Sequence, residues 1–486
     1  MKTTKFYTLL ALLLMAGGVT MQAQTEDEFW MGIDPPTTGV FSLIEDAEGN
    51  IIVGATGVYS SFDGGVTWSL IGLENSGILR LYEHTDGTLL AGTNFGGHPL
   101  HKREAGSTEW TALPVPTTTN GVSIGVTSDN SLLLGTWEGI YKSTDWDSTW
   151  TNVYVDHSLI CEVTDLLKLN NGTILASVFD HLAMGEGGLL QSTDNGETWE
   201  NIGLINESMV CLANNSKDVI YVGCITNPEL QTPGLFRSRD FGVTWQSFLP
   251  SQCVQSIAVD NNDVLYANMY CDSWGMPWGV FRSSDDGETW DCLELGMPNK
   301  MISKLHLSND GYLYAFGQYD NQIYRSRKSV YEEFEIEVVA CPENGGTAIG
   351  SGTYHFGEFA HFSASANANY QFVGWTNQDG DTISNEAEYA HMIARGGQIT
   401  AHFVSIEAVE ETEGNGFTLW PNPTSGAVQI EGVEAEEVLV YNALGQVVKR
   451  VRNSNEVSLE GLVQGVYLVR IRDKEGRIFL EKVMVR

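Results

Sequence analysis

An eight-residue pattern, Ser-x-Asp-x-Gly-x-Thr-Trp, recurs along this chain and constrains its fold more than any other feature. It reads SFDGGVTW at residues 61–68, STDNGETW at 192–199, SRDFGVTW at 238–245 and SSDDGETW at 283–290. A further return, STDWDSTW at 143–150, has Asp147 in place of the glycine, and a degenerate copy, EAGSTEW, ends at Trp110. The successive tryptophans are 42, 40, 49, 46 and 45 residues apart. This period fits one four-stranded unit per repeat.

Each interval has the same internal order, which is clearest between residues 39 and 73. Apolar alternation predicts strands near residues 40–45, 51–55, 57–61 and 68–73, so the recurring pattern is a hairpin turn between the third and fourth strands. In that turn the Asp63 carboxylate can accept backbone N–H bonds, and Gly65 can adopt a positive φ. Trp68 can bury roughly 150 to 250 Å² against the adjoining sheet.

The four clean copies resemble the Asp-box, the repeat of bacterial neuraminidase-type (BNR) β-propellers. In that family the box lies at the outer periphery, away from any active centre. The resemblance therefore implies that these residues are architectural. The residues with this predicted structural role are Ser61, Asp63, Gly65, Trp68, Asp145, Trp150, Asp194, Gly196, Trp199, Asp240, Gly242, Trp245, Asp285, Gly287 and Trp290.

The number of units follows from both ends of the repeat region. After Trp290, residues 301–329 hold three further strand signals without a clear box. Near the start, EDEFWMGID at residues 26–34 resembles a box tryptophan followed by a fourth strand. We therefore predict that residues 30–33 supply the outer strand of the last unit and close a ring of seven blades, which removes exposed sheet edges.

The amino-acid composition limits the classes of molecule that the protein is expected to bind. The chain has 486 residues and a formal net charge of −36, which argues against nucleic acids and anionic membrane surfaces. Seven cysteines occur without a close Cys-x-x-Cys spacing, so we do not expect them to bind a metal. We predict no metal site and no cofactor for the chain. Cys211 with Cys224, and Cys253 with Cys271, flank turns between successive strands and could form disulfides.

The first 23 residues carry Lys2 and Lys5 before an apolar run, and Met21-Gln22-Ala23 forms a plausible cleavage site. This is the pattern of a secretory signal peptide, and the run is too short for a stable transmembrane anchor. The exported chain would then begin with the propeller at residues 24–332.

Two further modules follow the propeller. Residues 333–405, with GGTAIGSGTYHFGEFAHFSA, YQFVGW and ITAHF, resemble the divergent internalin-type B-repeat, which implies a small β-rich module. Its Trp375 could be a ligand platform, although we favour a core position. After an acidic linker at 406–416, residues 417–486 contain PNPTSG, VYNALGQVV, LEGLVQGVYLVRI and EKVMV.

These last elements resemble the type A C-terminal sorting domain of the type IX (Por) secretion system. The resemblance implies a Bacteroidetes bacterium, the type IX translocon as a partner, and a secreted or outer-membrane surface-attached protein. It also implies removal of this domain on export. Physically, the segment is predicted to be a small antiparallel β-sandwich. The whole chain is thus predicted to be all-β.

Catalysis is not favoured by the sequence. A sialidase would need an arginine triad for a substrate carboxylate, but the exported segment has no arginine before Arg80 and none between Arg103 and Arg237. Arg237, Arg282 and Arg325 share one position before the box, where we predict surface residues. A two-carboxylate glycosidase is a second alternative. Its conceivable carboxylates are Asp156, Asp165, Asp180 and Asp272. We therefore assign no catalytic residue and keep exo-alpha-sialidase or another glycoside hydrolase as the alternative.

Binding has better local support. Loops between second and third strands lie on the face opposite the box, and they are long at residues 93–101, 179–188, 226–234 and 269–279. The last loop gathers aromatic residues that could stack on sugars or contact a protein, or could pack over the end of their own blade. We predict a cell-surface or secreted protein that binds a glycan or protein. The predicted ligand-binding residues are Tyr270, Asp272, Trp274, Trp278, Trp137 and Tyr319.

Overall fold

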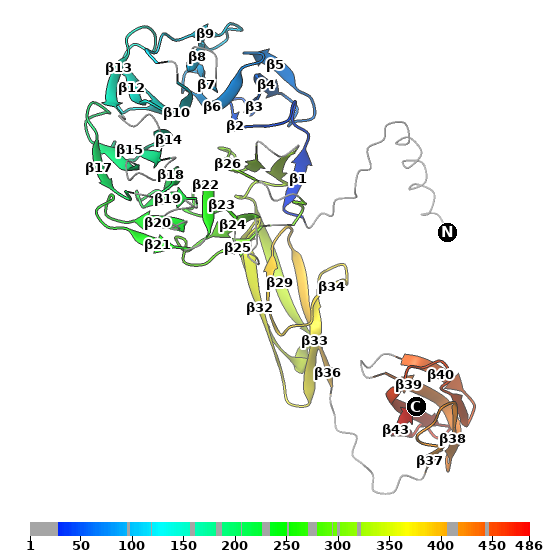
Figure 1. Ribbon diagram of the computed structural model, residues 1–486. Helices are drawn as coiled ribbons and strands as arrows, with labels where there is room; N and C mark the ends of the chain where they lie inside the picture. Colours follow the sequence, from blue (N-terminus) through cyan, green and yellow to red (C-terminus); the bar gives the residue numbers. More distant parts are fainter. Residues whose placement is uncertain are drawn as a thin grey trace. The chain divides into compact units, whose positions relative to one another are not determined.

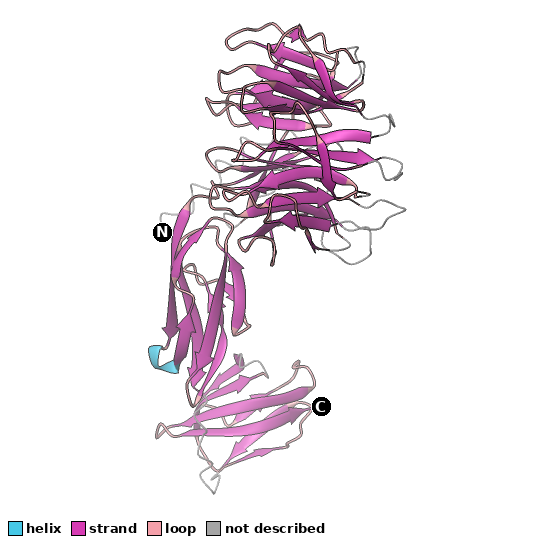
Figure 2. Cartoon of the chain, turned by 90° about the vertical axis from the view of Figure 1, so that its left-hand side faces the viewer, coloured by secondary structure: helices cyan, strands magenta, loops and turns pink. Residues whose placement is uncertain are grey.

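The protein is described from a computed structural model whose regular elements are labelled in Figure 1. The described residues are 28–94, 98–117, 119–155, 161–180, 187–205, 207–225, 234–249, 252–270, 279–293, 295–298, 302–317, 322–405, 417–442 and 447–486. Within these ranges one 3₁₀ turn, η1 (Glu343–Gly345), is the sole helical element, and every other element is a β-strand (Figure 2). The all-β prediction is therefore confirmed.

Between residues 30 and 326 the described chain forms seven four-stranded antiparallel sheets, which follow one another around a ring (Figure 1). Sheet 1 contains β2 (Ser42–Glu45), β3 (Ile51–Gly54), β4 (Val58–Ser61) and β5 (Ser69–Gly72). Sheet 2 contains β6 (Gly77–Glu83), β7 (Leu89–Asn94), β8 (Leu100–Arg103) and β9 (Thr111–Ala112). Sheet 3 contains β10 (Gly121–Val126), β11 (Leu132–Thr136), β12 (Gly139–Ser143) and β13 (Thr151–Val155).

The remaining four sheets continue the ring. Sheet 4 contains β14 (Cys161–Lys168), β15 (Ile174–Asp180), β16 (Gly188–Ser192) and β17 (Glu200–Gly203). Sheet 5 contains β18 (Met209–Asn214), β19 (Ile220–Cys224), β20 (Gly234–Ser238) and β21 (Gln246–Phe248). Sheet 6 contains β22 (Cys253–Val259), β23 (Leu265–Tyr270), β24 (Gly279–Ser283) and β25 (Asp291–Cys292). Sheet 7 contains β26 (Lys304–Leu307), β27 (Leu313–Phe316), β28 (Ile323–Ser326) and β1 (Trp30–Ile33).

Strand β1 joins the two ends of the ring. It pairs with β28 so that Trp30 lies opposite Ser326 and Ile33 opposite Ile323. The predicted pairing of residues 30–33 with the last unit is thus confirmed.

The sheets are held together by apolar faces on both sides of each central strand. In β3 every residue is buried, and the same is true of β11 and β19. These strands are continuous apolar runs because each face packs on a neighbouring sheet. Among the described residues, one cluster of buried side chains lies at each junction between successive sheets, including the junction of sheets 7 and 1.

The recurring turns have a common hydrogen-bond arrangement, shown here for residues 192–199. The Asp194 carboxylate accepts bonds from the Thr198 backbone N–H (2.9 Å), the Thr198 hydroxyl (2.6 Å) and the Ser192 hydroxyl (2.8 Å). The Ser192 hydroxyl in turn accepts the Gly196 N–H at 2.8 Å. The Thr198 side-chain hydrogen bond, followed by the Thr198 backbone bond, lowers the pKa of Asp194 to about 2. The turns at 61–68, 238–245 and 283–290 repeat these bonds.

The glycine of the turn is required for two reasons. Gly65 has φ +94°, and a Cβ atom there would lie 2.3 Å from Ile33 Cγ2 of sheet 7. In the clean turns both the fourth residue and the glycine have positive φ, as at Asn195 (59°) and Gly196 (80°); where Asp147 replaces the glycine, only the fourth residue, Trp146, keeps a positive φ, of 54°. The Trp146 N–H then donates to the Ser143 hydroxyl at 3.0 Å. The serine hydroxyl therefore binds a backbone N–H one residue earlier than in the clean turns, and Asp145 remains an acceptor of the turn.

Each turn also carries a tryptophan that packs against the preceding sheet. Trp68 donates its indole N–H to the Asp34 carbonyl after β1 at 2.8 Å, and Trp110 donates to the Ile71 carbonyl of β5 at 3.0 Å. Trp199, Trp245 and Trp290 lie at the edges of the corresponding clusters between sheets 3 and 4, 4 and 5, and 5 and 6. The direction of packing is therefore the same all around the ring.

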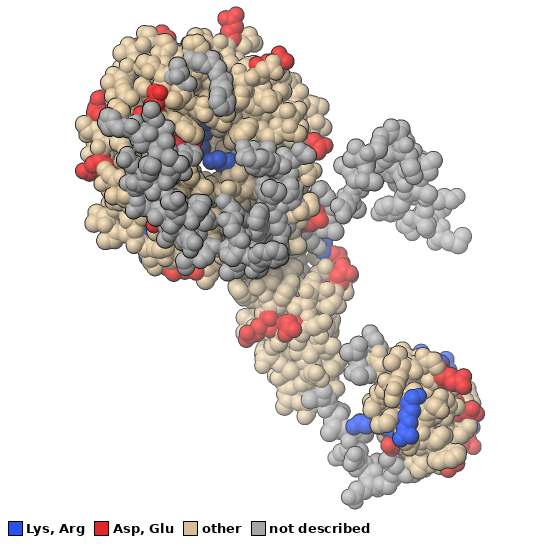
Figure 3. Space-filling model, viewed as in Figure 1, with Lys and Arg blue, Asp and Glu red and all other residues tan. Residues whose placement is uncertain are grey.

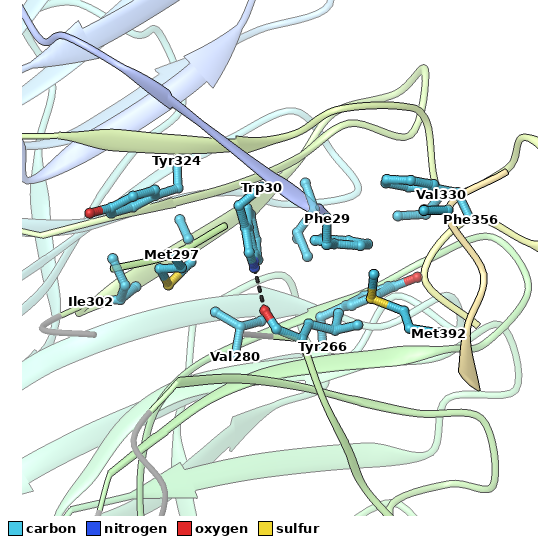
Figure 4. Close-up of a cluster of buried hydrophobic side chains, with 14 of the residues drawn as sticks. Phe29, Trp30, Tyr266, Val280, Met297, Ile302, Tyr324, Val330, Phe356 and Met392 are labelled. Atoms are coloured by element: carbon cyan, nitrogen blue, oxygen red, sulfur yellow. Dashed lines mark hydrogen bonds between the residues drawn. The ribbon is translucent and has the colours of Figure 1, made fainter. Parts of the chain in front are cut away.

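Trp30 occupies this position for sheet 7 (Figure 4). It is fully buried among side chains of sheets 6 and 7, and its indole N–H donates to the Leu293 carbonyl. The neighbouring Phe29 stacks on Phe356 with ring centroids 4.9 Å apart. Phe356 belongs to a segment, residues 350–363, that lies in the same compact unit as the ring.

The prediction that Arg237, Arg282 and Arg325 are surface residues is wrong. Arg237 is 2% exposed and Arg282 is 4% exposed, and Arg325 is half-buried. Arg237 Nη1 donates to the Asp286 carbonyl at 2.6 Å, and Nη2 donates to Gln246 (2.9 Å) and Glu288 (2.9 Å). Arg237 lies on a third strand that is buried between sheets, so its charged group extends into the next sheet instead of into water.

In sheets 3, 4 and 5 the residue before the turn serine is in fact a link to the next sheet. In addition to Arg237, Lys142 Nζ donates to the Asn195 carbonyl at 2.8 Å, and Gln191 Nε2 donates to the Phe241 carbonyl at 3.4 Å. Each acceptor is the fourth residue of the following turn. At these three positions a donor on one sheet binds the turn of the next, a contact that the sequence pattern did not reveal.

The disulfide that Cys211 and Cys224 could form is not present, since both are free, buried thiols. In the register of β18 and β19, Cys211 lies opposite Gly223 while Met209 lies opposite Cys224. The two cysteines consequently face opposite sides of the sheet, and they belong to different hydrophobic clusters. Cys271, the expected partner of Cys253, lies outside the described residues.

The B-repeat-like segment forms two sheets. The five-stranded sheet has the order β31 (Gly352–His355), β29 (Glu333–Cys341), β36 (Gly397–Ser405), β33 (Tyr370–Thr376), β34 (Thr382–Ser384). The three-stranded sheet has the order β30 (Gly346–Ile349), β32 (Phe359–Ala366), β35 (Glu388–Met392). Trp375 is fully buried and donates its indole N–H to the Glu386 carbonyl at 3.0 Å, which is a core position and not an exposed platform.

The C-terminal segment forms two sheets around one core. The three-stranded sheet contains β37 (Thr418–Trp420), β38 (Ala427–Glu431) and β41 (Glu456–Ser458). The four-stranded sheet has the order β40 (Val447–Arg452), β39 (Ala435–Tyr441), β42 (Gly465–Asp473), β43 (Ile478–Val485). Side chains from both sheets, such as Val428 and Val469, form a single buried cluster. No helix in the described parts of the chain is long and apolar enough to span a membrane.

Because Arg237 links two sheets, we predict that its replacement lowers the free energy of unfolding more than replacement of the nearby Arg239. We expect Arg237→Met to lower the free energy of unfolding by about 2–3 kcal/mol, because it leaves the Asp286 carbonyl and the Glu288 carboxylate without their donor. Arg239→Met removes an exposed pair with Asp286 and should cost less than about 1 kcal/mol. Urea unfolding followed by tryptophan fluorescence measures both, and equal effects would contradict the assigned role of Arg237.

Candidate ligand-binding site

The first strand of each sheet faces the middle of the ring, where a cavity of about 330 Å³ is found. Most of its lining comes from the beginnings of first strands, and the rest from the ends of second strands. The cavity therefore lies toward the face that carries the loops between second and third strands, opposite the recurring turns. Its lining residues are Phe41, Leu79, Arg80, Val122, Glu162, Thr164, Phe179, Val210, Ile225 and Lys304.

The two basic side chains that line this cavity, Arg80 and Lys304, differ in their hydrogen-bond and ion-pair partners. Arg80 Nη2 pairs with Asp165 Oδ1 at 3.0 Å, and Asp165 Oδ2 accepts the Leu212 backbone N–H at 3.1 Å. Lys304 Nζ has no hydrogen bond or ion pair with any residue that the structure describes. Burial, and then the positive charge of Arg80, lower the pKa of Lys304. Figure 3 shows Lys and Arg atoms in the middle of the ring. An unpaired ammonium group in a largely apolar cavity can bind a ligand group that accepts hydrogen bonds.

A second cavity, of about 390 Å³, shares Arg80 and Lys304 but has different chemistry. It includes Glu45, Glu83 and His306. Burial, and then the charge of Asp310, raise the pKa of Glu45 to about 7. Burial, and then the charge of Arg80, lower the pKa of His306 to about 4, so that this imidazole is neutral at pH 7. The middle of the ring thus has an apolar, cationic cavity toward the loops and a more acidic one beyond it.

The residues predicted from sequence are only partly described. Trp137 lies in the turn between β11 and β12, is half-buried and does not line either cavity. Its neighbour Glu138 accepts bonds from the hydroxyls of Thr117 (2.6 Å) and Tyr141 (3.2 Å). Tyr270 ends β23, but its side chain, like all of Asp272, Trp274, Trp278 and Tyr319, lies outside the described residues. Those assignments stay predictions.

The structure tests one of the four carboxylates considered for a glycosidase. Asp165, which was conceivable as a loop carboxylate, lies on β14, and its two oxygens are held by Arg80 and Leu212. It is therefore a poor general acid or base. Asp156, Asp272 and the side chain of Asp180 lie outside the described residues. Among the side chains that are described, no group of three or more His, Cys, Asp or Glu is placed to hold a metal ion.

Sequence reasoning missed Arg80 and Lys304. The available signal was a basic residue in a predicted first strand, as in GILRLYE at 77–83 and KLHL at 304–307. A strand that lines a channel can carry such residues on its inner side, but the sequence does not show which residues of other sheets they meet.

Comparison with family models identifies the two C-terminal modules. Residues 418–486 match the model of the secretion system C-terminal sorting domain, and residues 336–407 match that of the divergent InlB B-repeat domain. The protein is a type IX secretion substrate. It is therefore secreted or attached to the outer-membrane surface, with the secretion system as a partner. No curated protein matches the chain in sequence.

Comparison with solved structures supports the fold of the ring. The extracellular domain of a putative one component system from B. thetaiotaomicron superposes with a TM-score of 0.50 at 14% identity, covering 93% of this chain and 58% of that one. Streptogramin B lyase matches with a TM-score of 0.49 at 12% identity, over 61% of this chain and 96% of that one. The structural neighbours are β-propellers, and the B. thetaiotaomicron match, at 14% identity, supports the fold alone. The chain spans little more than half of the B. thetaiotaomicron domain.

The raised pKa of Glu45 predicts a pH dependence. The folded state holds this proton more tightly than the unfolded chain, so the contribution of Glu45 to stability is fully present below pH 4.5 and is lost as the pH rises through about 7. We expect Glu45→Gln to have no effect at pH 4 and to raise the free energy of unfolding by about 1 kcal/mol at pH 8, after allowance for solvent screening.

Urea unfolding of Glu45→Gln at the two pH values measures this difference. Glu200→Gln, at an exposed position of β17, is the matched control, and its effect on the free energy of unfolding should be the same at both pH values. A Glu45→Gln effect independent of pH would show that folding leaves the pKa of this carboxyl unchanged, and would contradict the prediction.

Proposed function

We propose that this protein is a secreted or cell-surface binding protein whose seven sheets are the blades of an Asp-box β-propeller. The propeller recognises a glycan or protein ligand on its loop-bearing face. Four observations support the proposal: the turn chemistry at residues 61–68 and its repeats, the long loops predicted on one face, the cavity beneath that face, and the sorting domain. The unpaired ammonium of Lys304 carries most of the argument.

Lys304 is half-buried, and an ammonium group confined in a cavity without a partner among the described residues contributes little to folding. Removing an ammonium group from water costs several kcal/mol unless hydrogen bonds or a counter-charge replace the lost hydration. The inward position of Lys304 on β26, beside Phe41 and Val210, is thus poorly explained by stability. A ligand that brings an acceptor group to Nζ would replace the missing hydration, and the apolar lining would bury its non-polar part.

The alternative of an exo-alpha-sialidase or another glycoside hydrolase has weaker support. Arg80 is engaged by Asp165, and Arg237 is buried between sheets 5 and 6, so neither is available for a substrate carboxylate. We therefore assign no catalytic role to any residue. We propose that the predicted aromatic residues of the loop-bearing face, with Trp137, select the ligand.

The decisive experiment is binding of the full chain to a glycan array and to a panel of purified surface proteins. We expect Lys304→Met to weaken binding at least tenfold, and Trp274→Ala and Trp278→Ala each to weaken it several-fold. Lys217→Met, at an exposed position on the ring, is the matched control and should bind like the wild type.

Two results would contradict the proposal. If Lys304→Met binds the ligand as tightly as the wild type, the cavity is not part of the binding site. Turnover of fluorogenic sialosides or β-glucans that a carboxylate variant abolishes would establish the hydrolase alternative instead.

A further inference from the structure

The outer face of the four-stranded sheet in the sorting domain has an ordered arrangement of side chains. Directly paired residues of neighbouring strands project to the same side, so the register defines rows across β40, β39, β42 and β43. The rows on the face away from the buried cluster are Arg452-Glu437-Arg472-Ile478, Arg450-Leu439-Arg470-Leu480 and Val447-Tyr441-Leu468-Lys482, followed by the pair Val466-Met484. We call this surface the arginine face.

The arginine face is strongly basic in an otherwise acidic chain. Residues 417–486 hold nine of the 26 Lys and Arg residues but only nine of the 62 Asp and Glu residues. Five of those nine cations are on this one face: Arg450, Arg452, Arg470, Arg472 and Lys482. Figure 3 shows Lys and Arg atoms gathered in a column on the visible side of this domain.

The carboxylates near the arginine face do not balance its charge. Glu437 Oε1 is shared by Arg452 Nε at 3.3 Å and Arg450 Nε at 3.9 Å. Arg472 Nε lies 3.3 Å from Glu436 Oε2. Arg470 and Lys482 have no ion pair with any residue in the described part of the chain. A surplus of positive charge therefore remains on the middle of the sheet.

The arginine face also exposes apolar side chains, in its third row and in the pair that follows that row. Val466 is 51% exposed and Met484 is 44% exposed, while Leu439 is covered by its arginine neighbours. Arginine and methionine are enriched in protein interfaces, where lysine and glutamate are depleted. Arginine also binds carboxylates through two parallel hydrogen bonds, which a lysine cannot do. Four of the five cations of this face are arginines.

We propose that the arginine face is the surface through which the sorting domain docks on an acidic protein surface of the type IX secretion machinery. The first two rows of the arginine face, which contain its four arginines, would pair with carboxylates of the partner. The row of Leu468 and the pair Val466-Met484 would contribute apolar contacts at the edge of the interface. The proposal rests on the identity of the sorting domain and is independent of ligand binding by the propeller.

The test compares two single charge reversals in the full chain, produced in a bacterium with a working type IX system. Arg470→Glu changes the centre of the arginine face, and Lys474→Glu makes the same change in charge on the hairpin beyond it, where Lys474 pairs with Glu434. We expect Arg470→Glu to lower the exported amount at least fivefold, with accumulation in the periplasm. Arg450→Glu/Arg470→Glu should lower it more than tenfold, and Lys474→Glu should stay within twofold of the wild type.

Folding of each variant is checked by its thermal unfolding midpoint. Should Arg470→Glu fail to fold, Arg470→Gln removes the charge with a smaller change and should still lower export, while Arg470→Lys should restore it only in part. A folded Arg470→Glu chain exported at the wild-type level would overturn the proposal, as would an equal loss in Lys474→Glu.

A second measurement separates protein docking from lipid docking. The purified full chain is mixed with vesicles that contain about 30% anionic phospholipid, a composition at which basic surfaces bind membranes. We expect no binding that depends on Arg450 and Arg470. Binding lost in Arg450→Glu/Arg470→Glu would assign the arginine face to lipid and overturn the proposal. Glycan or protein binding by the released propeller should be unaffected by these variants, so the two proposals can fail separately.

Discussion

The structure depends on the packing of each sheet against the one before it. A tryptophan and a glycine of one sheet's turn meet the preceding sheet, and a donor such as Arg237 or Lys142 reaches forward to the next turn. No single sheet could bury both faces of strands such as β3, whose residues are all buried. Only a ring gives every sheet two neighbours, and β1 provides the missing strand for sheet 7.

Closure of the ring also creates the candidate site. The first strands bring Arg80 of sheet 2 and Lys304 of sheet 7 to one cavity, and Asp165 of sheet 4 pairs with Arg80 there. In an isolated sheet these groups would be hydrated and unremarkable. Within the ring they share a confined space, which lowers the pKa of Lys304 and leaves its ammonium group without a partner among the described residues. Recognition on the loop-bearing face would thus use a feature that belongs to the assembly of sheets and not to any single repeat.

Export and recognition are carried by separate modules with different charge. The sorting domain has its own core, formed by side chains such as Val428 and Val469, and an outer face rich in arginine. The remainder of the chain is strongly acidic. A basic docking face on an acidic substrate offers the secretion machinery a distinct target, because like charge on the remainder disfavours other contacts with an acidic partner.

The sequence by itself determined the features that arise within a few residues. The turn bonds of Asp194 join residues at most four positions apart, so the pattern predicted them; the strand order and the sorting domain were readable in the same way. The tertiary structure alone decided that Arg237 is buried, that Cys211 and Cys224 face opposite sides of a strand pair, and that Lys304 lies near Arg80. The physical reason is that burial and charge environment depend on neighbours tens to hundreds of positions away, which a local pattern does not specify.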